Sequence, residues 1–305
     1  MDPLTELLRT VRVEGTVFSR AEMRAPWGLS TRGGTNAIFH VVLQGQGVVV
    51  VDGRVVPWSR GDLVVLPHGT AHVMADSEQR RAVPIATAPR AKVAGLPCVQ
   101  FGGEGPLTQL LCGTFRVDPE ARELLARALP PVLVMRAQAR TSAVLEATLA
   151  LVAEEVADRR PGADAVIERL AEVLFVQVLR GAQAELQQGW LAAFGDERLV
   201  RAMDALQREP ARDWSAADLA KIAGMSRSTF FGRFSEVVGE PPNAWLLRWR
   251  MHLARRALRS SRVPLAELAA KVGYGSEAAF SRAFKRFVGE PPSAWRERAR
   301  SGPAA

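Results

Sequence analysis

The chain has 305 residues, of which 48% are hydrophobic and 24% are charged, and this composition is that of an ordinary globular protein long enough for two domains. No apolar run is long enough to cross a bilayer, and acidic Asp2 and Glu6 argue against a signal peptide, so we expect a cytoplasmic protein without a membrane segment. Only two cysteines are present, which excludes a disulfide-stapled scaffold.

The first predicted elements are β-strands. The stretch IFHVVLQGQGVVVVDGRVVPWSRGDLVVLPHGTAHVM starts at Ile38, is rich in valine and is broken by glycines. Asp52-Gly53 between two apolar runs is a strong hairpin signal. Several short strands at this spacing predict a sandwich or a barrel.

One part of this β-region, GDLVVLPHGTAH, resembles the second signature of the cupin barrel. That signature fixes a Gly, a Pro, a second Gly and a His, and all four are present. They are Gly61, Pro67, Gly69 and His72. The resemblance implies a β-barrel that encloses a site for an effector or a metal.

The first cupin signature is incomplete. His40 is in place, but Val42 stands where the family has a second metal-binding His, and Gln46 stands where it has a Glu. A metal-dependent cupin enzyme needs several imidazoles and a carboxylate to hold its cation. Two alternatives therefore stay open: His40 and His72 bind a divalent metal, or they pack or bind an organic ligand without one.

Polar side chains that recur along these strands are the candidate effector-binding residues. Alternate residues of a strand face the same side, so we expect these side chains to point into the barrel. They are His40, Gln46, His68 and His72. Cys112, in LLCGTF, and Cys98 are candidates for redox sensing, with the alternative that each is a small buried hydrophobic residue.

Helices are expected between residues 119 and 207. LEATLALVAEEVADR has an apolar stripe with helical spacing and ends at Arg160-Pro161-Gly162. VIERLAEVLFVQVLR carries a wider stripe, predicted to end near Gly181. The wide stripe packs within the protein or forms the interface of a homodimer, and the sequence leaves both open.

Nearly the same heptapeptide occurs twice in the last third of the chain, as GEPPNAW from Gly239 and GEPPSAW from Gly289. The match extends backwards over about 30 residues. Each copy predicts two short helices joined by a Gly-containing turn, which is a helix-turn-helix. The equivalent serines and phenylalanines are Ser226 and Ser276, Phe230 and Phe280, and Phe234 and Phe284.

The positive charge is concentrated on this repeated region. Residues 201–305 contain 19 Lys and Arg against 10 Asp and Glu, whereas residues 1–200 contain 21 against 22. A basic surface over helix-turn-helix motifs is expected of a DNA-binding protein, because neutralising phosphates releases counterions.

The repeat, and the string VGYGSEAAFSRAFKRFVGEPPSAWR above all, resembles the DNA-binding domain of the AraC/XylS transcriptional regulators. Together with FHVVLQGQG and DLVVLPHGTAH, the resemblance covers nearly the whole chain and is to the subgroup with a cupin sensor. It implies an α+β multidomain fold. The predicted parts are a cupin-like sensor domain at residues 1–130, a helical linker and dimerisation segment at 131–205, and the DNA-binding domain at 206–305.

The second helix of each motif supplies the candidate contacts with promoter DNA. In the first motif they are Arg227, Ser228, Phe231 and Arg233. In the second motif they are Glu277, Ala278, Ser281, Arg282 and Lys285. We expect Arg282 to read a base, since arginine bonds both guanine acceptors, with a phosphate contact as the alternative.

The preferred function is a transcription regulator, not an enzyme. Its cupin domain would sense a small molecule, a metal or an oxidant and change promoter binding. The resemblance also implies a homodimer, with RNA polymerase as a candidate partner, and the sequence leaves open whether the regulator is an activator or a repressor. The alternatives are a metal-dependent cupin enzyme tethered to DNA and a nucleoid protein without sequence preference. Metal analysis and promoter-binding assays discriminate among them.

Overall fold

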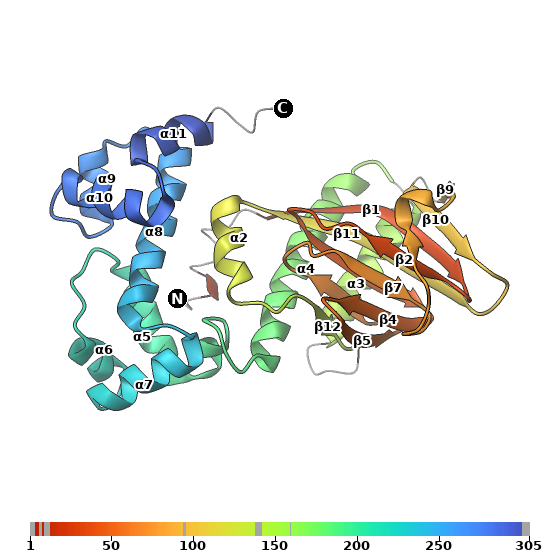
Figure 1. The fold of residues 1–305 in the computed structure, drawn as a ribbon, viewed down its shortest axis with the longest axis horizontal. Helices are drawn as coiled ribbons and strands as arrows, with labels where there is room; N and C mark the ends of the chain where they lie inside the picture. Colours follow the sequence, from red (N-terminus) through yellow and green to blue (C-terminus); the bar gives the residue numbers. More distant parts are fainter. Residues whose placement is uncertain are drawn as a thin grey trace. The chain divides into compact units, whose positions relative to one another are not determined.

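The computed structural model describes residues 4–5, 8, 13–93, 96–137, 142–158 and 160–300. The chain folds into two compact units (Figure 1). The β unit contains the described residues within Arg12–Asp118 and Leu125–Glu185. The helical unit contains the described residues within Met1–Val11, Pro119–Leu124 and Leu186–Ala305.

Two sheets make up most of the β unit. The seven-stranded sheet has the order β12-β6-β3-β11-β1-β10-β9, and the five-stranded sheet has the order β5-β4-β7-β2-β8. Neighbouring strands are antiparallel except in the pairs β1 with β10 and β2 with β8. The strands are β1 (Val13–Arg24), β2 (Gly28–Thr31), β3 (Ala37–Gln44), β4 (Gln46–Val51), β5 (Arg54–Ser59), β6 (Leu63–Leu66), β7 (His72–Ala75), β8 (Val83–Pro84), β9 (Arg90–Val93), β10 (Leu96–Gly102), β11 (Leu107–Val117) and β12 (Leu133–Met135).

The predicted hairpin is confirmed between β4 and β5. Val51 pairs with Arg54, so Asp52 and Gly53 alone form the turn. Both have positive φ, at 49° and 77°, as a two-residue turn that follows the twist of the strands requires.

A hydrophobic core lies between the two sheets and draws on both. Its members include Ile38 and Val42 of β3, Val49 of β4 and Met74 of β7. Because side chains alternate along a strand, these residues define the inward face of each strand.

The other face of the seven-stranded sheet is covered by helix α4. Phe115 of β11 stacks on Phe39 of β3 with ring centroids 4.6 Å apart, and it meets Phe175 of α4 edge-on at 5.4 Å. Gly15 of β1 allows the closest approach, since a Cβ there would lie 2.0 Å from the Cβ of Ala171.

The described helices are α2 (Pro119–Ala126), α3 (Ser142–Asp158), α4 (Ala163–Glu185), α5 (Glu197–Arg208), α6 (Ala216–Ala223), α7 (Arg227–Val238), α8 (Pro242–Ser260), α9 (Leu265–Lys271), α10 (Glu277–Val288) and α11 (Pro292–Arg300). None of them is long and apolar enough to span a membrane.

Two expectations for the central region were wrong. Helix α4 does not end near Gly181 but continues to Glu185. Gly181 serves packing instead, because a Cβ there would lie 1.7 Å from Cε of Met135. The region is also not entirely helical, since Leu133–Met135 forms β12 and extends the sheet beside β6. The predicted architecture, a β-rich N-terminal region, a helical linker and an all-α C-terminal region, is confirmed.

Candidate DNA interface and effector site

The first helix-turn-helix motif consists of α6 and α7. Ser215 and Asp218 form a reciprocal capping box at the start of α6, and Gly224 closes that helix with φ 66°. The hydroxyl of Ser226 then accepts the Thr229 N–H at the start of α7. The short turn predicted from sequence is therefore built from local capping contacts.

The second motif, α9 and α10, repeats only part of this geometry, because α9 begins after Pro264 without a side-chain cap. Ser276 caps α10 by accepting the Ala279 N–H. Phe280 and Phe284 are fully buried with ring centroids 5.6 Å apart, and the equivalent Phe230 and Phe234 show the same separation. The buried faces of α7 and α10 are thus packed alike, and the opposite faces of both helices are exposed to solvent.

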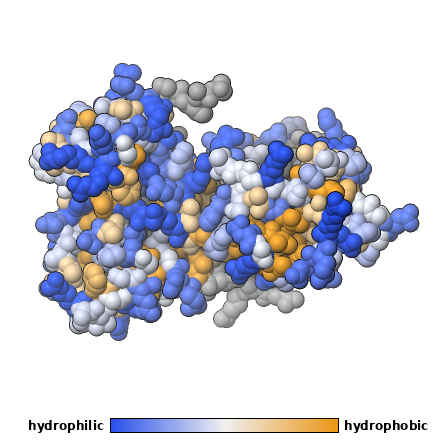
Figure 2. All heavy atoms as spheres, viewed as in Figure 1, coloured by the Kyte–Doolittle hydropathy of each residue, from blue (hydrophilic) through white to orange (hydrophobic). Residues whose placement is uncertain are grey.

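Most of the predicted DNA contacts lie on those opposite faces. The exposed residues are Arg227, Ser228, Phe231, Arg233, Glu277, Ala278, Arg282 and Lys285, and Ser281 is half-buried. Arg233 is also paired with Asp196 at 3.3 Å and with Glu236 at 3.7 Å. Figure 2 shows hydrophilic side chains over most of the visible face of the helical unit.

The repeated GEPP sequence is a corner between helices. Gly239 ends α7 with φ 83°, and Pro242 is the first residue of α8. Gly289 ends α10 with φ 94°, and Pro292 begins α11. The tryptophan three residues later is buried in both copies, as predicted, and therefore supports the core.

The sequence analysis missed the role of the glutamate in this corner. Glu240 accepts two hydrogen bonds from the guanidinium of Arg248, and Glu290 pairs in the same way with Arg298. Both arginines lie eight residues after their glutamate. Extending the repeat alignment past the tryptophans would have identified these pairs.

Inside the β unit, two histidines and a cysteine form a hydrogen-bonded cluster. His40 lies on the inward face of β3, and His72 lies on the inward face of β7 in the other sheet. Their Nε2 atoms are 3.2 Å apart, and His40 Nδ1 lies 3.1 Å from Sγ of Cys112 on β11. All three side chains are buried.

The direction of each hydrogen bond follows from the partner at one end of the cluster. His72 Nδ1 lies 3.0 Å from the carbonyl oxygen of Thr70, which only accepts, so Nδ1 carries the hydrogen. In a neutral ring Nε2 of His72 then accepts, and His40 donates from its Nε2. His40 Nδ1 is left to accept the S–H of Cys112.

Burial keeps this cluster uncharged. It lowers the pKa of His40 to about 3, with the neighbouring His72 adding to the effect, and it also lowers the pKa of His72. Burial raises the pKa of the Cys112 thiol to about 12. Near neutral pH the cluster therefore holds two neutral imidazoles and a thiol.

Comparisons with known proteins identify both parts of the chain. A family model described as Cupin matches residues 2–184, and one described as Helix-turn-helix domain matches residues 219–298. A putative AraC-like transcription regulator of Streptomyces lividans is 31% identical over 280 residues, which cover 90% of this chain and 91% of the relative. The chain belongs to the AraC/XylS family of transcriptional regulators.

A second curated relative agrees with this membership. A putative AraC-like transcription regulator of Streptomyces antibioticus is 32% identical over 281 residues, which cover 90% of this chain and 91% of the relative. A solved structure of the DNA-binding domain of AdpA, in complex with a target DNA, is 32% identical, covers 36% of this chain and 99% of that chain, and has a TM-score of 0.33. The curated relatives are transcription regulators and not enzymes, and this chain is accordingly a DNA-binding AraC-type regulator.

The regulator's other predicted effector residues do not join the buried cluster. Gln46 is exposed at the start of β4, while its neighbour Gly47 is buried. His68 is half-buried, and its Nε2 has no hydrogen-bond partner among the described residues. Cys112, predicted only as a redox candidate, is the side chain that contacts His40.

The cluster does not fit a metal site of the kind that the cupin fold suggests. Within the described part of the chain, no three His, Cys, Asp or Glu side chains come together to hold a metal ion. Val42 occupies the place of the family's second His and is buried in the apolar core. His40 turns one ring nitrogen to His72 and the other to Cys112, so these three side chains do not converge on one cation position, and a protein metal site typically has three or four ligands.

The second cysteine lies on the other face of the sheet. Cys98 is opposite Arg20, and Cys112 is opposite Ser19, so the strand β1 separates the two. Val99 faces the core between the sheets, as Cys112 does, and the adjacent Cys98 therefore points away from it. Two strand spacings amount to roughly 10 Å, which is beyond the Cα separation of about 7 Å that a disulfide tolerates.

Proposed function

We propose that this regulator receives its signal at the Cys112–His40–His72 cluster and that the signal changes how its two helix-turn-helix motifs bind promoter DNA. The observation that carries the proposal is a chain of three hydrogen bonds, from a thiol through two neutral imidazoles to a backbone carbonyl, inside an apolar core. The bond between His40 and His72 joins the two sheets. A ligand that competes for one of the three hydrogen bonds therefore changes a contact between the sheets.

The effector that fits this interior is a small uncharged molecule with hydrogen-bond acceptors. The cluster is neutral and offers no charge to balance an ion. Trp27 and Trp58 belong to the same core, with ring centroids 6.3 Å apart, and their buried indole N–H groups have no hydrogen-bond partner among the described residues. A buried donor without a partner costs about 1–3 kcal/mol, so an acceptor placed there would bind favourably.

For the DNA interface, we propose that Arg282 reads a base, and that Phe231 contacts a thymine methyl. Both side chains are exposed, on α10 and on α7. An exposed aromatic ring on a recognition helix is costly in water and suits an apolar contact in the major groove. Arg227 and Lys285 are assigned to phosphates, and the remaining candidate contacts are assigned to the edges of the groove: Ser228, Arg233, Glu277, Ala278 and Ser281.

A homodimer is proposed through helices α3 and α4. Val144 and Leu151 on α3 are 57% and 49% exposed, and Val166 and Val173 on α4 are each 41% exposed. Both pairs have a spacing of seven residues, so each pair lies along one side of its helix. Leu151→Glu should shift the sedimentation coefficient from dimer to monomer, and a wild-type chain that is monomeric would refute the assignment.

The signal site is tested by perturbing the cluster and measuring DNA binding. The probe is a duplex that the wild-type chain selects from a randomised pool. His72→Ala should change the affinity for this duplex by roughly fivefold or more, because coupling between sites typically amounts to 1–3 kcal/mol. Cys98→Ala is the matched control, since Cys98 is equally buried but faces away from the cluster. Equal affinities for all three proteins would refute the proposal.

A further inference from the structure

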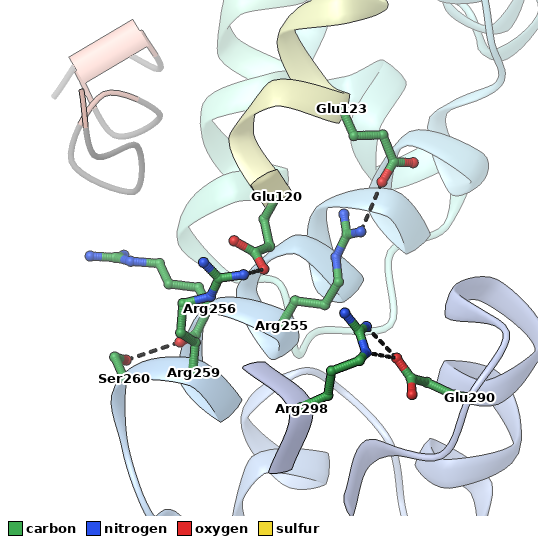
Figure 3. Close-up of polar contacts among 8 residues, drawn as sticks. All are labelled: Glu120, Glu123, Arg255, Arg256, Arg259, Ser260, Glu290 and Arg298. Carbon is green, nitrogen blue, oxygen red and sulfur yellow. Dashed lines mark hydrogen bonds and ion pairs between the residues drawn. The ribbon is translucent and has the colours of Figure 1, made fainter. Parts of the chain in front are cut away.

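One short segment of the chain leaves the β unit and returns to it. Residues Pro119–Leu124 of α2 belong to the helical unit, although the chain immediately before and after them belongs to the β unit. This segment presents two carboxylates to α8, the helix that links the two helix-turn-helix motifs. Glu120 accepts a hydrogen bond from Arg259 Nη2 at 2.6 Å, and Glu123 accepts one from Arg255 Nη1 at 2.8 Å (Figure 3).

These two ion pairs are unlike exposed surface pairs. The side chain of Glu120 is only 4% exposed, and that of Arg255 is 13% exposed. A buried carboxylate is costly unless it is paired, so Glu120 holds α2 and α8 in one register. Trp190 fixes the far end of the segment by donating its indole N–H to the carbonyl oxygen of Leu124 at 2.9 Å.

From Arg259 the contacts lead to the second recognition helix. The Arg259 guanidinium lies over the ring of Trp295, 5.7 Å from its centroid. Trp295 meets Phe284, on the buried face of α10, at 6.3 Å. Arg298 lies over the same tryptophan at 6.0 Å and pairs with Glu290, directly after the end of α10. In the first motif the equivalent Trp245 stacks on Trp249 at 5.9 Å instead.

We propose that Glu120 is a positioning residue for DNA binding. It holds Arg259 against Trp295 and thereby fixes α10, while α7 does not depend on it. Glu123 supports the same register through Arg255. Because α2 begins two residues after β11, the strand that carries Cys112, the segment also gives the cupin region a covalent route to the second recognition helix. The route from the cupin region to α10 rests on the signal site proposed above.

The positioning role is tested first in the full-length protein without DNA. In Glu120→Gln, amide hydrogen exchange in α10 and α11 should become about tenfold faster, since a charged hydrogen bond is lost, while α6 and α7 keep their rates. Glu123→Gln should have a smaller effect in the same direction, and it replaces Glu120→Gln in the measurement if that variant folds poorly. Glu267→Gln is the control, because it removes a carboxylate from an exposed ion pair with Lys271 in the same motif.

DNA binding separates positioning from a general loss of stability. On the duplex selected by the wild-type chain, Glu120→Gln should lose discrimination at the base pairs read by α10 and keep it at those read by α7. The control Glu267→Gln should keep both. Equal weakening at the two half-sites, or unchanged exchange in α10 and α11, would overturn the positioning role.

The route from the cupin region is tested by combining variants. If His72→Ala changes DNA affinity in the wild-type background, it should have less than about half that effect, in logarithmic terms, when Glu120 is also replaced by Gln. An undiminished effect would overturn the route through α2 and leave the signal site intact. If His72→Ala has no effect in either background, the signal site fails, and the positioning role is still judged by the exchange and half-site measurements.

Discussion

The buried histidine cluster makes the stability of the β unit sensitive to acid. An unfolded histidine has a pKa of about 6.5, whereas burial lowers the pKa of His40 in the folded protein to about 3. Below pH 6.5 the unfolded chain therefore binds a proton that the folded chain refuses. Well below pH 6.5, each further pH unit lowers the free energy of unfolding by about 1.36 kcal/mol for this one proton. Acidification from pH 7 to pH 5 should therefore lower it by about 2 kcal/mol through His40 alone.

The lowered pKa of His72 acts in the same direction. Above pH 6.5 both states carry neutral imidazoles, and this contribution is constant. Below that value the loss continues until the folded His40 itself takes up a proton, near pH 3. Against a typical total of 5–15 kcal/mol, a change of about 2 kcal/mol is readily measured.

Urea unfolding at pH 7 and pH 5, followed by the circular dichroism of the sheets, provides the assay. Carboxylates and the other histidines contribute in every variant, so the comparison is between wild type and His40→Leu. The variant should be less stable at pH 7, because it removes the hydrogen bonds that His40 makes to the Cys112 thiol and to His72 Nε2, but it should lose about 2 kcal/mol less on acidification. If wild type and variant lose the same free energy of unfolding between pH 7 and pH 5, His40 is not a neutral, buried histidine.

Three further outcomes are expected. Arg282→Ala should lose about 1–3 kcal/mol of binding to the selected duplex and become indifferent at one base pair, whereas uniform weakening on all sequences would assign Arg282 to a phosphate. Protein purified without an affinity tag should contain less than about a tenth of an equivalent of transition metal in elemental analysis, and a stoichiometric metal would contradict the ligand argument. Mild oxidation followed by mass spectrometry should not yield a quantitative Cys98–Cys112 disulfide, because the two side chains point to opposite faces of the sheet.

The helix-turn-helix motifs could be predicted from sequence because their signals are local. Capping residues, the Gly of each turn and the phenylalanines at helical spacing all act within a few residues, and they recur in both copies. Gly181 shows where such local reasoning fails. A glycine near the end of an apolar stripe indicates a helix end, but Met135, 46 positions earlier, packs against it, and only the tertiary fold reveals that contact.

The effector cluster was predictable in part for the same reason. The cupin signatures identified His40 and His72. The inference that Gln46 also faces inward assumed that the inward-outward alternation of β3 continues unbroken into β4. A register shift where β3 pairs with β11, between Val42 and Gln44, resets the alternation before β4 begins, and Gln46 is exposed. The contact between His40 and Cys112 spans 72 positions and depends on the pairing of β3 with β11, which the sequence does not specify.

The two GEPP corners have a consequence for how such a regulator evolves. Each corner, with its paired Glu and Arg and its buried Trp, sets the exit of a recognition helix through residues that lie off the DNA-facing surface. Within this one chain the corners have stayed nearly identical, while the exposed faces of α7 and α10 have become unlike, with Phe231 and Gly232 in one at the positions of Ser281 and Arg282 in the other. A duplicated motif with a fixed corner can change its exposed face by surface substitutions in one copy alone, so a single chain presents two unlike surfaces on one repeated scaffold.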